Sequence, residues 1–270
     1  MSAWIAQVSR AVLWLLIVAL IYGKLADMTA IQTARQRARA ELTSEIKAEA
    51  RRQLAAEGAQ RLSLRAVARE LGMASSALYR YFPSRDDLLT ALIIDAYDAI
   101  GESAERSGAG VPAADVRGRW RACCHAVRDW ALAHPHEYAL IYGSPVPGYQ
   151  APQETIASAI RVPAVLGRLL ADLQRARGPG VTNGGQPGAG GPGGGQAGPL
   201  PQPLAAQAEA VAAAVAPGVP GPLMTRGLIS WTQLFGIISF ELFGQLVGVA
   251  EPADALFGYA VDQMADFVGL

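Results

Sequence analysis

The sequence SLRAVARELGMASSALYRYFPSRDDLL, residues 63–89, decides the fold. Ser63 can cap a first helix, because its hydroxyl can accept a hydrogen bond from a free N–H of the first turn. Gly72 supplies the permissive backbone that a turn between two crossed helices requires. A second helix, 75–81, must end before Pro83, which cannot continue it. The stretch therefore predicts a helix-turn-helix, the unit that places its second helix in a DNA major groove.

Two longer helices are expected on either side of this unit. Residues 34–57 repeat apolar side chains at helical spacing, which predicts one amphipathic helix. Ser84 and Asp87 have the spacing of a capping box with Asp in place of Glu, so a further helix should follow, 85–103. The segment 34–88 is therefore predicted to form a three-helix DNA-binding domain.

Charge is distributed unevenly along a chain whose formal net charge is zero. Residues 34–90 hold 11 basic and 7 acidic side chains, a net charge of +4. Residues 91–270 hold 10 basic and 15 acidic side chains, a net charge of −5. A basic block joined to an acidic remainder is expected when only one part of a protein meets phosphate.

The remainder of the chain, 89–270, also has a helical pattern, and no run of alternating β-branched residues predicts a sheet. The chain is therefore predicted to be all-α. Residues 178–203 contain 11 Gly and 6 Pro in 26 positions, which favours a disordered insert, because ordering them would cost roughly 1–2 kcal/mol per residue for little burial. The expected helical segments are 114–142 with an interruption at His134-Pro135-His136, 153–176 with a break near Pro163, 204–215, 225–247 and 253–268.

The N-terminal extension, residues 1–27, has two interpretations. Its apolar run 11–22 is shorter than the roughly 20 residues that span a bilayer, but it can serve as an anchor. Lys24 and the arginines after it would then keep the remainder, including the DNA-binding domain, on the cytoplasmic side of the inner membrane. Alternatively, Met28 is the true first residue and the extension is upstream sequence. The anchored form leaves a second function class open, a membrane-anchored helical signalling or scaffold protein.

No catalytic residue, metal site or cofactor is expected. Cys123 and Cys124 are adjacent, and neighbouring side chains on a helix diverge by about 100°, so they do not converge on one ion. The Gly-rich stretch 178–198 lacks the Gly-Lys-Ser/Thr ending and the preceding strand of a phosphate-binding loop. No nucleophile is paired with a base in the sequence. An enzyme is therefore the least favoured class.

Residues 35–88 combine a glycine turn with a block of aromatic residues, in the set Arg65, Ala68, Leu71, Gly72, Ala77, Leu78, Tyr79, Tyr81, Phe82, Ser84, Arg85, Leu88 and Leu89. With these residues the segment resembles the DNA-binding domain of the TetR family of bacterial transcriptional regulators. A second resemblance lies near the C-terminus, where 231–236 and 241–244 are similar to the Trp-His-Gly signature of one TetR ligand-domain group. Phe235 stands where that group has histidine, so it can keep the packing role of that position but not its hydrogen bonds.

The resemblance implies an all-helical, cytoplasmic homodimer that is paired through its last two helices. It also implies a repressor that binds a palindromic operator and is released by a small-molecule ligand bound in the C-terminal domain, 89–270. Small side chains at the front of the second helix favour readout of shape and methyl groups over base hydrogen bonds. The family's DNA contacts fall on Arg65, Ser75, Ser76, Ala77, Tyr79, Tyr81 and Arg85.

Some of these positions also have a simpler structural interpretation. Tyr81 can equally be a core side chain, and Arg65 a solvated charge. Aromatic side chains of the C-terminal domain can line a ligand pocket between helices or form its core, and core is the first expectation. The candidates for the pocket are Trp120, Trp130, Tyr138, Tyr142, Trp231 and Phe235, with Phe240 beside them.

Overall fold

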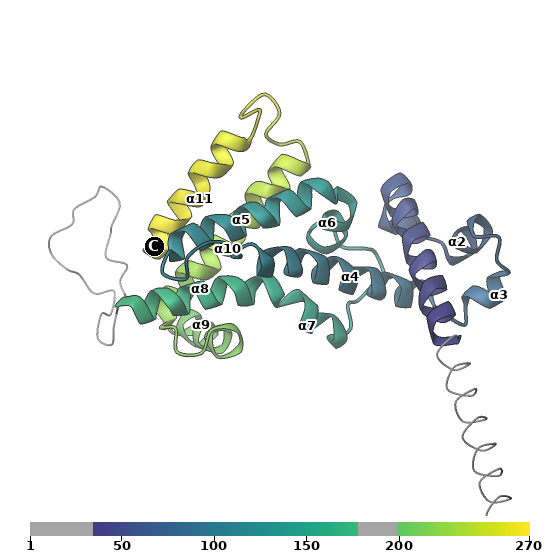
Figure 1. The fold of residues 1–270 in the computed structure, drawn as a ribbon, viewed down its shortest axis with the longest axis horizontal. Coiled ribbons are helices and arrows are strands. Elements are labelled where there is room, and N and C mark those ends of the chain that lie inside the picture. The colour runs from purple at the N-terminus through teal and green to yellow at the C-terminus, as the bar shows by residue number, and fades with distance from the viewer. Residues whose placement is uncertain (1–34, 178–198) are drawn as a thin grey trace, which may run out of the picture. The chain divides into compact units, whose positions relative to one another are not determined.

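A computed structural model describes residues 35–177 and 199–270 of the protein (Figure 1). Every regular element in these two ranges is a helix, which confirms the all-α prediction. None of these helices combines the length and the apolar character needed to cross a bilayer. The predicted N-terminal extension, 1–27, and most of the predicted Gly/Pro insert, 178–198, lie outside the described residues.

The chain divides into two compact units. The smaller unit contains the described residues 35–52 together with Ser63–Pro83, and the larger unit contains Gln53–Leu62 and Ser84–Leu270. The chain therefore passes between the units at three points. Residues 53–62, which the sequence analysis grouped with the DNA-binding domain, belong to the larger unit by their contacts.

The smaller unit is built on the helix-turn-helix that the sequence predicts. Helix α2, Leu64–Glu70, begins at Ser63, whose Oγ accepts a hydrogen bond from the Ala66 N–H at 3.4 Å. Gly72 has a φ of +64°, the left-handed conformation in which a residue with a side chain would be strained. The turn at Gly72 is closed by a 2.8 Å hydrogen bond from the Met73 N–H to the Ala68 carbonyl. The predicted cap and glycine turn are both confirmed.

The second helix is shorter than the predicted 75–81. Helix α3 spans Ser75–Leu78, and the chain then tightens into a turn. In that turn the Leu78 carbonyl accepts hydrogen bonds from the Tyr81 N–H at 2.8 Å and from the Phe82 N–H at 3.1 Å, so three-residue and four-residue spacings are mixed there. Pro83 prevents the helix from resuming. Leu78 is fully buried, so α3 is fixed to the unit by one apolar face.

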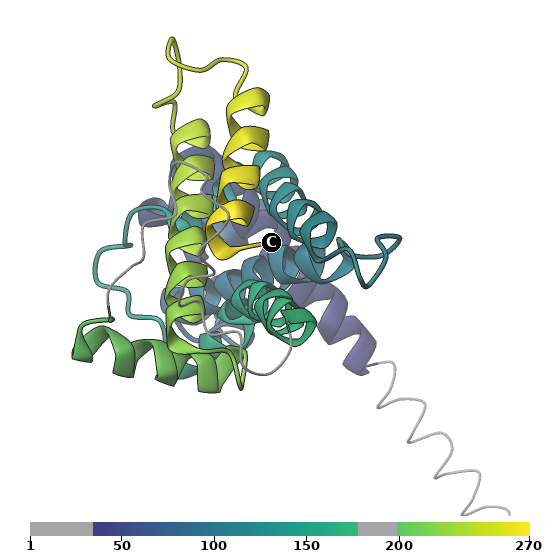
Figure 2. The same cartoon turned by 90° about the vertical axis from the view of Figure 1, so that its left-hand side faces the viewer.

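The larger unit is a helical bundle around α4, Arg85–Arg106, which contacts α5, α6, α7 and α8 (Figures 1 and 2). Ser84 caps α4 by accepting a hydrogen bond from the Asp87 N–H at 3.1 Å, as predicted. The core of the larger unit includes Trp120, Tyr138 and Phe257, all of them buried. The other elements are η1 (Ala59–Arg61), α5 (Val116–Ala133), α6 (Pro135–Tyr142), η2 (Gln153–Thr155), α7 (Ile156–Ala159), α8 (Arg161–Arg177), α9 (Gln202–Val215), α10 (Gly221–Leu242) and α11 (Asp254–Val268).

Several helix boundaries in the larger unit differ from the sequence prediction. The break predicted near Pro163 lies at Ile160, and Pro163 sits in the first turn of α8, where its missing N–H forfeits no helical hydrogen bond. Helix α9 begins at Gln202, so the last two residues of the predicted insert are helical. Helix α10 starts earlier than 225 and ends at Leu242, just before Gly244 with its φ of +80°.

A buried arginine joins three helices of the larger unit. Arg128 of α5 is only 6% exposed and donates two hydrogen bonds, of 2.7 and 2.6 Å, to the Glu241 carboxylate of α10. It also donates to Asp254 of α11 at 3.0 Å, and its guanidinium lies 4.8 Å from the ring centre of Phe257. These carboxylates raise the pKa of Arg128 above its ordinary value, so the charge is retained in a buried setting. The arginine therefore fixes α10 and α11 against α5.

We expect Arg128→Ala to lower the free energy of unfolding by about 3–5 kcal/mol, because it leaves the Glu241 carboxylate without its buried partner. Urea denaturation followed by circular dichroism measures the change. The control is Arg121→Ala, which removes an exposed arginine paired with Asp262 and should change stability little. Equal losses in the two variants would contradict a structural role for the buried arginine.

Candidate functional site

The smaller unit presents small and aromatic side chains on α3 and the turn after it. Ser76 is exposed and Tyr79 is 42% exposed, while Ser75, Ala77 and Tyr81 are partly exposed. Leu78 and Phe82 of the same segment are buried. The structure therefore leaves five of the seven predicted DNA contacts at least partly exposed on α3 and the turn after it.

Helix α3 has only four residues, and its N-cap, Ala74, has no side chain that can accept a hydrogen bond. A helix this short has a small dipole, because the dipole grows by summing aligned peptide units. Attraction for a phosphate must therefore come mainly from side chains around α3. The residues suited to this are hydroxyl donors and arginines.

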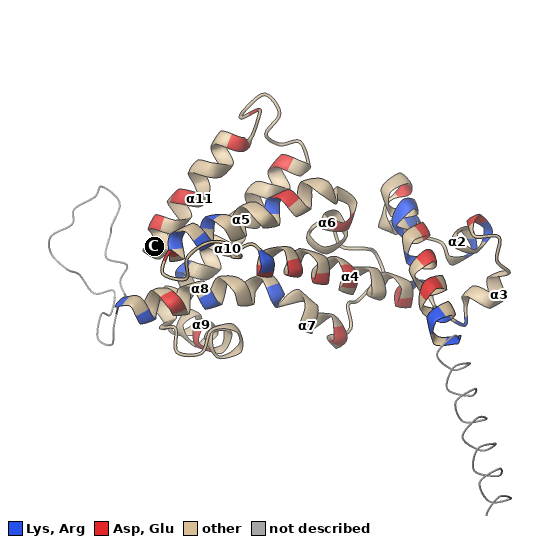
Figure 3. Cartoon of the chain, in the orientation of Figure 1, with Lys and Arg blue, Asp and Glu red and all other residues tan. Residues whose placement is uncertain are grey.

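Arginines supply positive charge to the same unit (Figure 3). Its described residues contain nine basic and four acidic side chains. Arg65, on α2, is exposed and forms no ion pair with any other described residue. Arg39, in the helix 35–57, places its guanidinium 5.1 Å from the ring centre of Tyr81 and donates to the Arg80 carbonyl at 3.3 Å. Sequence reasoning missed Arg39, and its only signal was its membership of a basic helix.

The seventh predicted DNA contact, Arg85, lies in the larger unit and bonds to the protein's own backbone. Its guanidinium donates to the carbonyls of Leu62 at 3.2 Å, Ala59 at 2.8 Å and Gln60 at 3.3 Å. The side chain is 31% exposed. These bonds hold the turn 59–62 against the start of α4 and use much of the donor capacity that a phosphate would require.

Two of the predicted pocket aromatics, Trp120 and Trp130, are core side chains. Trp120 is almost fully buried and donates from its Nε1 to the Val261 carbonyl at 3.3 Å. Trp130 is buried and stacks on His134 with ring centres 5.0 Å apart. Phe240, by contrast, is exposed on α10.

The other four candidates form a connected group with Tyr97, which sequence reasoning did not select. We call these five residues the aromatic cluster: Tyr97, Tyr138, Tyr142, Trp231 and Phe235. The rings of Tyr142 and Phe235 are 4.2 Å apart, those of Tyr138 and Tyr142 are 5.1 Å apart, and Tyr97 meets Tyr142 edge-on at 5.9 Å. Phe235, where the Trp-His-Gly group has histidine, is buried and keeps a packing role.

Polar atoms of the aromatic cluster are largely removed from water. Burial raises the pKa of Tyr138 to about 12 and also raises that of Tyr142, so both hydroxyls stay protonated. The Tyr138 hydroxyl donates to the Phe235 carbonyl at 3.1 Å. The buried Trp231 Nε1 has no hydrogen-bond partner among the described residues, and an unpaired buried donor is the kind of group that a ligand acceptor satisfies.

The two cysteines are core side chains. Cys123 and Cys124 are both buried and unpaired, and burial raises the pKa of the Cys123 thiol to about 12. Such a thiol stays protonated and is a poor nucleophile or metal ligand. Over the residues that the structure describes, no three metal-ligating side chains gather at one point.

The last two helices, α10 and α11, lie side by side (Figure 2), and each carries exposed apolar side chains. Those of α11, Leu256, Tyr259 and Phe267, recur with helical spacing, and Tyr259 is 66% exposed. Those of α10 are Ile229 and Phe240, with Phe240 at 56% exposure. We call these five residues the apolar face. Gly236 lies between Ile229 and Phe240, and a Cβ there would meet no other atom within 4 Å.

Two family models match the chain. The model described as bacterial regulatory proteins of the tetR family matches residues 46–92, and the one described as tetracyclin repressor-like, C-terminal domain, matches residues 120–264. The HTH-type transcriptional regulators Rv1816 of Mycobacterium tuberculosis and Mb1846 of Mycobacterium bovis are similar in sequence. Each is 37% identical over 204 residues, which cover 72% of this chain and 78% of theirs.

Solved structures agree with these matches. The crystal structure of SCO4313, described as a regulatory protein, is 32% identical with a TM-score of 0.66, and the match covers 86% of this chain and 98% of that one. A Rhodococcus protein of unknown function shares the fold at 23% identity and a TM-score of 0.59, over 85% of this chain and 95% of its own. The chain therefore belongs to the TetR family of helix-turn-helix transcriptional regulators.

Proposed function

We propose that this regulator is a repressor that binds a palindromic operator as a homodimer and leaves it when a small molecule binds the larger unit. The observation that carries the DNA-binding part is the outward face of α3 and the following turn, where Ser76 and Tyr79 are exposed while Leu78 is buried behind them. Since its target is chromosomal DNA, we place the protein in the cytoplasm.

The DNA contacts divide into a reading face and charged flanks. Ser75, Ser76 and Ala77 are small, so the front of α3 can approach base edges closely but offers few hydrogen bonds to them. Tyr79 and Tyr81 can donate their hydroxyls to phosphates, and Arg65 and Arg39 add positive charge beside them. Much of the affinity should therefore depend on phosphate contacts and on salt concentration.

Arg65→Ala should weaken operator binding and lower the slope of log affinity against log salt by about one, because one phosphate contact is lost. The operator is located by footprinting the DNA upstream of the protein's own gene, and affinity is measured by fluorescence anisotropy over a salt series. The matched control is Arg168→Ala, an exposed arginine of α8, which should leave the slope unchanged. A slope that is the same for both variants would argue against the contact.

Arg85 enters the proposal in a positioning role, because three backbone carbonyls engage its guanidinium. Arg85→Ala should therefore lower operator affinity while leaving the salt slope within experimental error of the unmodified protein. The same anisotropy series measures both quantities. A fall of about one in the slope would instead identify Arg85 as a phosphate contact.

Dimerisation is assigned to the apolar face. A monomer rarely leaves a large contiguous apolar surface in water, and here such side chains follow one line on each of two neighbouring helices. Gly236 leaves room on α10 for the backbone of a second helix to approach. The two helices of one protomer and the same two of another would together form a four-helix interface with two-fold symmetry.

Phe240→Asp and Tyr259→Asp should each convert the dimer to monomer at micromolar concentration, because each places a charge in the apolar face. Light scattering coupled to size-exclusion chromatography measures the mass. Ile156→Asp provides the control, since Ile156 is an exposed apolar residue of α7 outside this face. A dimer that survives both substitutions would assign the contact to another surface.

The effector site is assigned to the aromatic cluster. Its rings provide apolar contact area, and the Trp231 Nε1 is a donor without a partner among the described residues. A ligand with an aromatic or apolar body and one hydrogen-bond acceptor would suit this environment. The cluster joins α4, α6 and α10, so a molecule inserted there would alter the packing of these three helices.

A further inference from the structure

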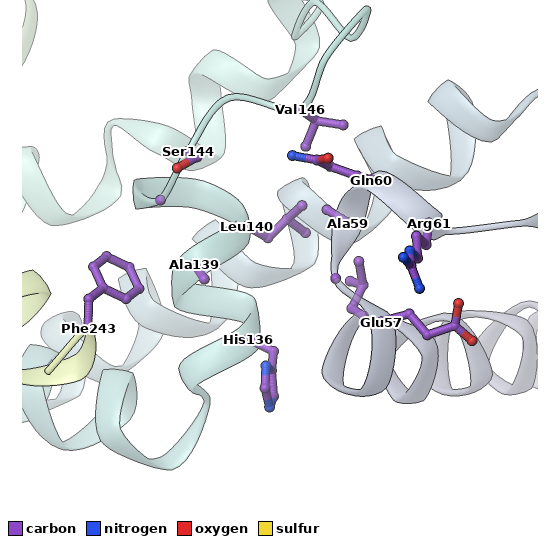
Figure 4. A pocket seen from close by; sticks show the side chains of 13 residues that line it. Glu57, Ala59, Gln60, Arg61, His136, Ala139, Leu140, Ser144, Val146 and Phe243 are labelled. Carbon is purple, nitrogen blue, oxygen red and sulfur yellow. The ribbon is translucent and has the colours of Figure 1, made fainter.

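A pocket of about 460 Å³ opens in the larger unit, and none of the residues that line it belongs to the aromatic cluster (Figure 4). One wall is formed by the end of the first helix and η1, including Leu54, Glu57 and Arg61. The other wall is formed by α6 and the loop after it, including His136 and Leu140. Its volume lies in the range of sites that hold drug-sized molecules, about 300–1,000 Å³.

The lining separates into an apolar part and a polar part. Leu140 lies at the middle of the pocket and Phe243 at one end, while Glu57 and Arg61 lie at the other end (Figure 4). Glu57 and Arg61 carry opposite charges, and neither forms an ion pair with another described residue. The two charges sum to zero, so the polar end has no net charge to attract a lone anion or cation. It favours a neutral group that can both donate and accept hydrogen bonds.

Helix α6 links the pocket to the aromatic cluster. Helix α6 turns Tyr138 and Tyr142 toward the aromatic cluster and Ala139 and Leu140 toward the pocket. Phe243 lines the pocket and also contacts Tyr138, with ring centres 6.4 Å apart. A molecule in the pocket would therefore touch the helix that carries two of the cluster's tyrosines.

The opposite wall belongs to Gln53–Leu62, the segment that continues into the smaller unit at both of its ends. Arg85 donates hydrogen bonds to three carbonyls of this segment, which holds the segment against the start of α4. A ligand shifts a conformational equilibrium only by binding one state better than another. A molecule that bridges this segment and α6 has that property, since its affinity depends on their separation.

We propose that this pocket is a regulatory site for an uncharged amphipathic small molecule, whose binding between residues 53–62 and α6 changes operator affinity. The inference rests on the proposed function, because the regulatory effect requires an operator-binding protein. The pocket is distinct from the effector site assigned to the aromatic cluster, and the two would be coupled through α6.

Binding is tested on the full chain with two neutral probes, para-fluorobenzamide and 2-(para-fluorophenyl)ethanol, by ligand-observed fluorine NMR. Ala139→Trp should fill the pocket and weaken binding of the probes at least about tenfold. His136→Trp provides a second test, because His136 is exposed and its replacement requires no repacking of the core. Ala157→Trp, at an exposed alanine of α7 outside the pocket, should bind the probes unchanged.

Charged analogues test the chemical class. The anion para-fluorobenzoate and the cation para-fluorobenzylammonium should each bind at least about tenfold more weakly than the amide. Tighter binding of either ion, failure of both neutral probes to bind, or probe binding that survives both pocket substitutions would overturn the proposal.

The regulatory effect is measured as operator affinity with and without saturating para-fluorobenzamide. The unmodified protein should show a change of at least about threefold, and Ala139→Trp should show none. Probe binding without any change in operator affinity would overturn the regulatory role. Absence of operator binding before any probe is added would instead count against the proposed function, and the NMR result would still decide whether the pocket binds neutral molecules.

Discussion

The bonds from Arg85 to the carbonyls of residues 59, 60 and 62 are the constraint on which the functional architecture depends. These bonds fasten residues 53–62, which continue into the smaller unit at both ends, to the start of α4. Helix α4 contacts most of the other helices of the bundle. A guanidinium suits this task, because its rigid, planar set of donors can reach several carbonyls at once and its charge does not titrate. Any rearrangement of this segment must break or replace those bonds.

Helix α6 forms the wall of the pocket opposite that segment. Its eight residues begin at Pro135 and present two tyrosines to the aromatic cluster and several smaller side chains to the pocket. Burial of the Tyr138 hydroxyl against the Phe235 carbonyl fixes one side of the helix to α10. The buried Arg128, bonded to Glu241 of α10 and Asp254 of α11, fixes α10 in turn against the rest of the bundle. A short helix between a tightly packed core and an open pocket is a suitable element for transmitting a ligand's effect.

Much of the fold could be predicted from the sequence because its signals are local. Ser63, Gly72 and Ser84 each act within a few residues of themselves, and all three perform the predicted task. The length of α3 could not be predicted, since Tyr79 and Tyr81 are compatible with a helix and only the geometry before Pro83 ends it. The role of Arg85 was equally hidden, because its partners are carbonyls more than 20 residues away. The place of Tyr97 in the aromatic cluster could not be predicted for the same reason, since contacts between distant segments leave no local pattern in the sequence.

The small side chains of α3 give the apolar face a role in specificity, if the protein dimerises there as proposed. Two serines and an alanine at the front of α3 provide few base-specific hydrogen bonds, so one protomer alone discriminates weakly among sequences. Two half-sites held at a fixed spacing multiply that discrimination, because both must match at once and the DNA between them must adopt the required shape. In the proposed dimer, specificity would depend on the distance between the two DNA-binding units as much as on their side chains. A ligand that alters residues 53–62 would then release the operator without touching a predicted DNA contact, because a change in that distance would be enough.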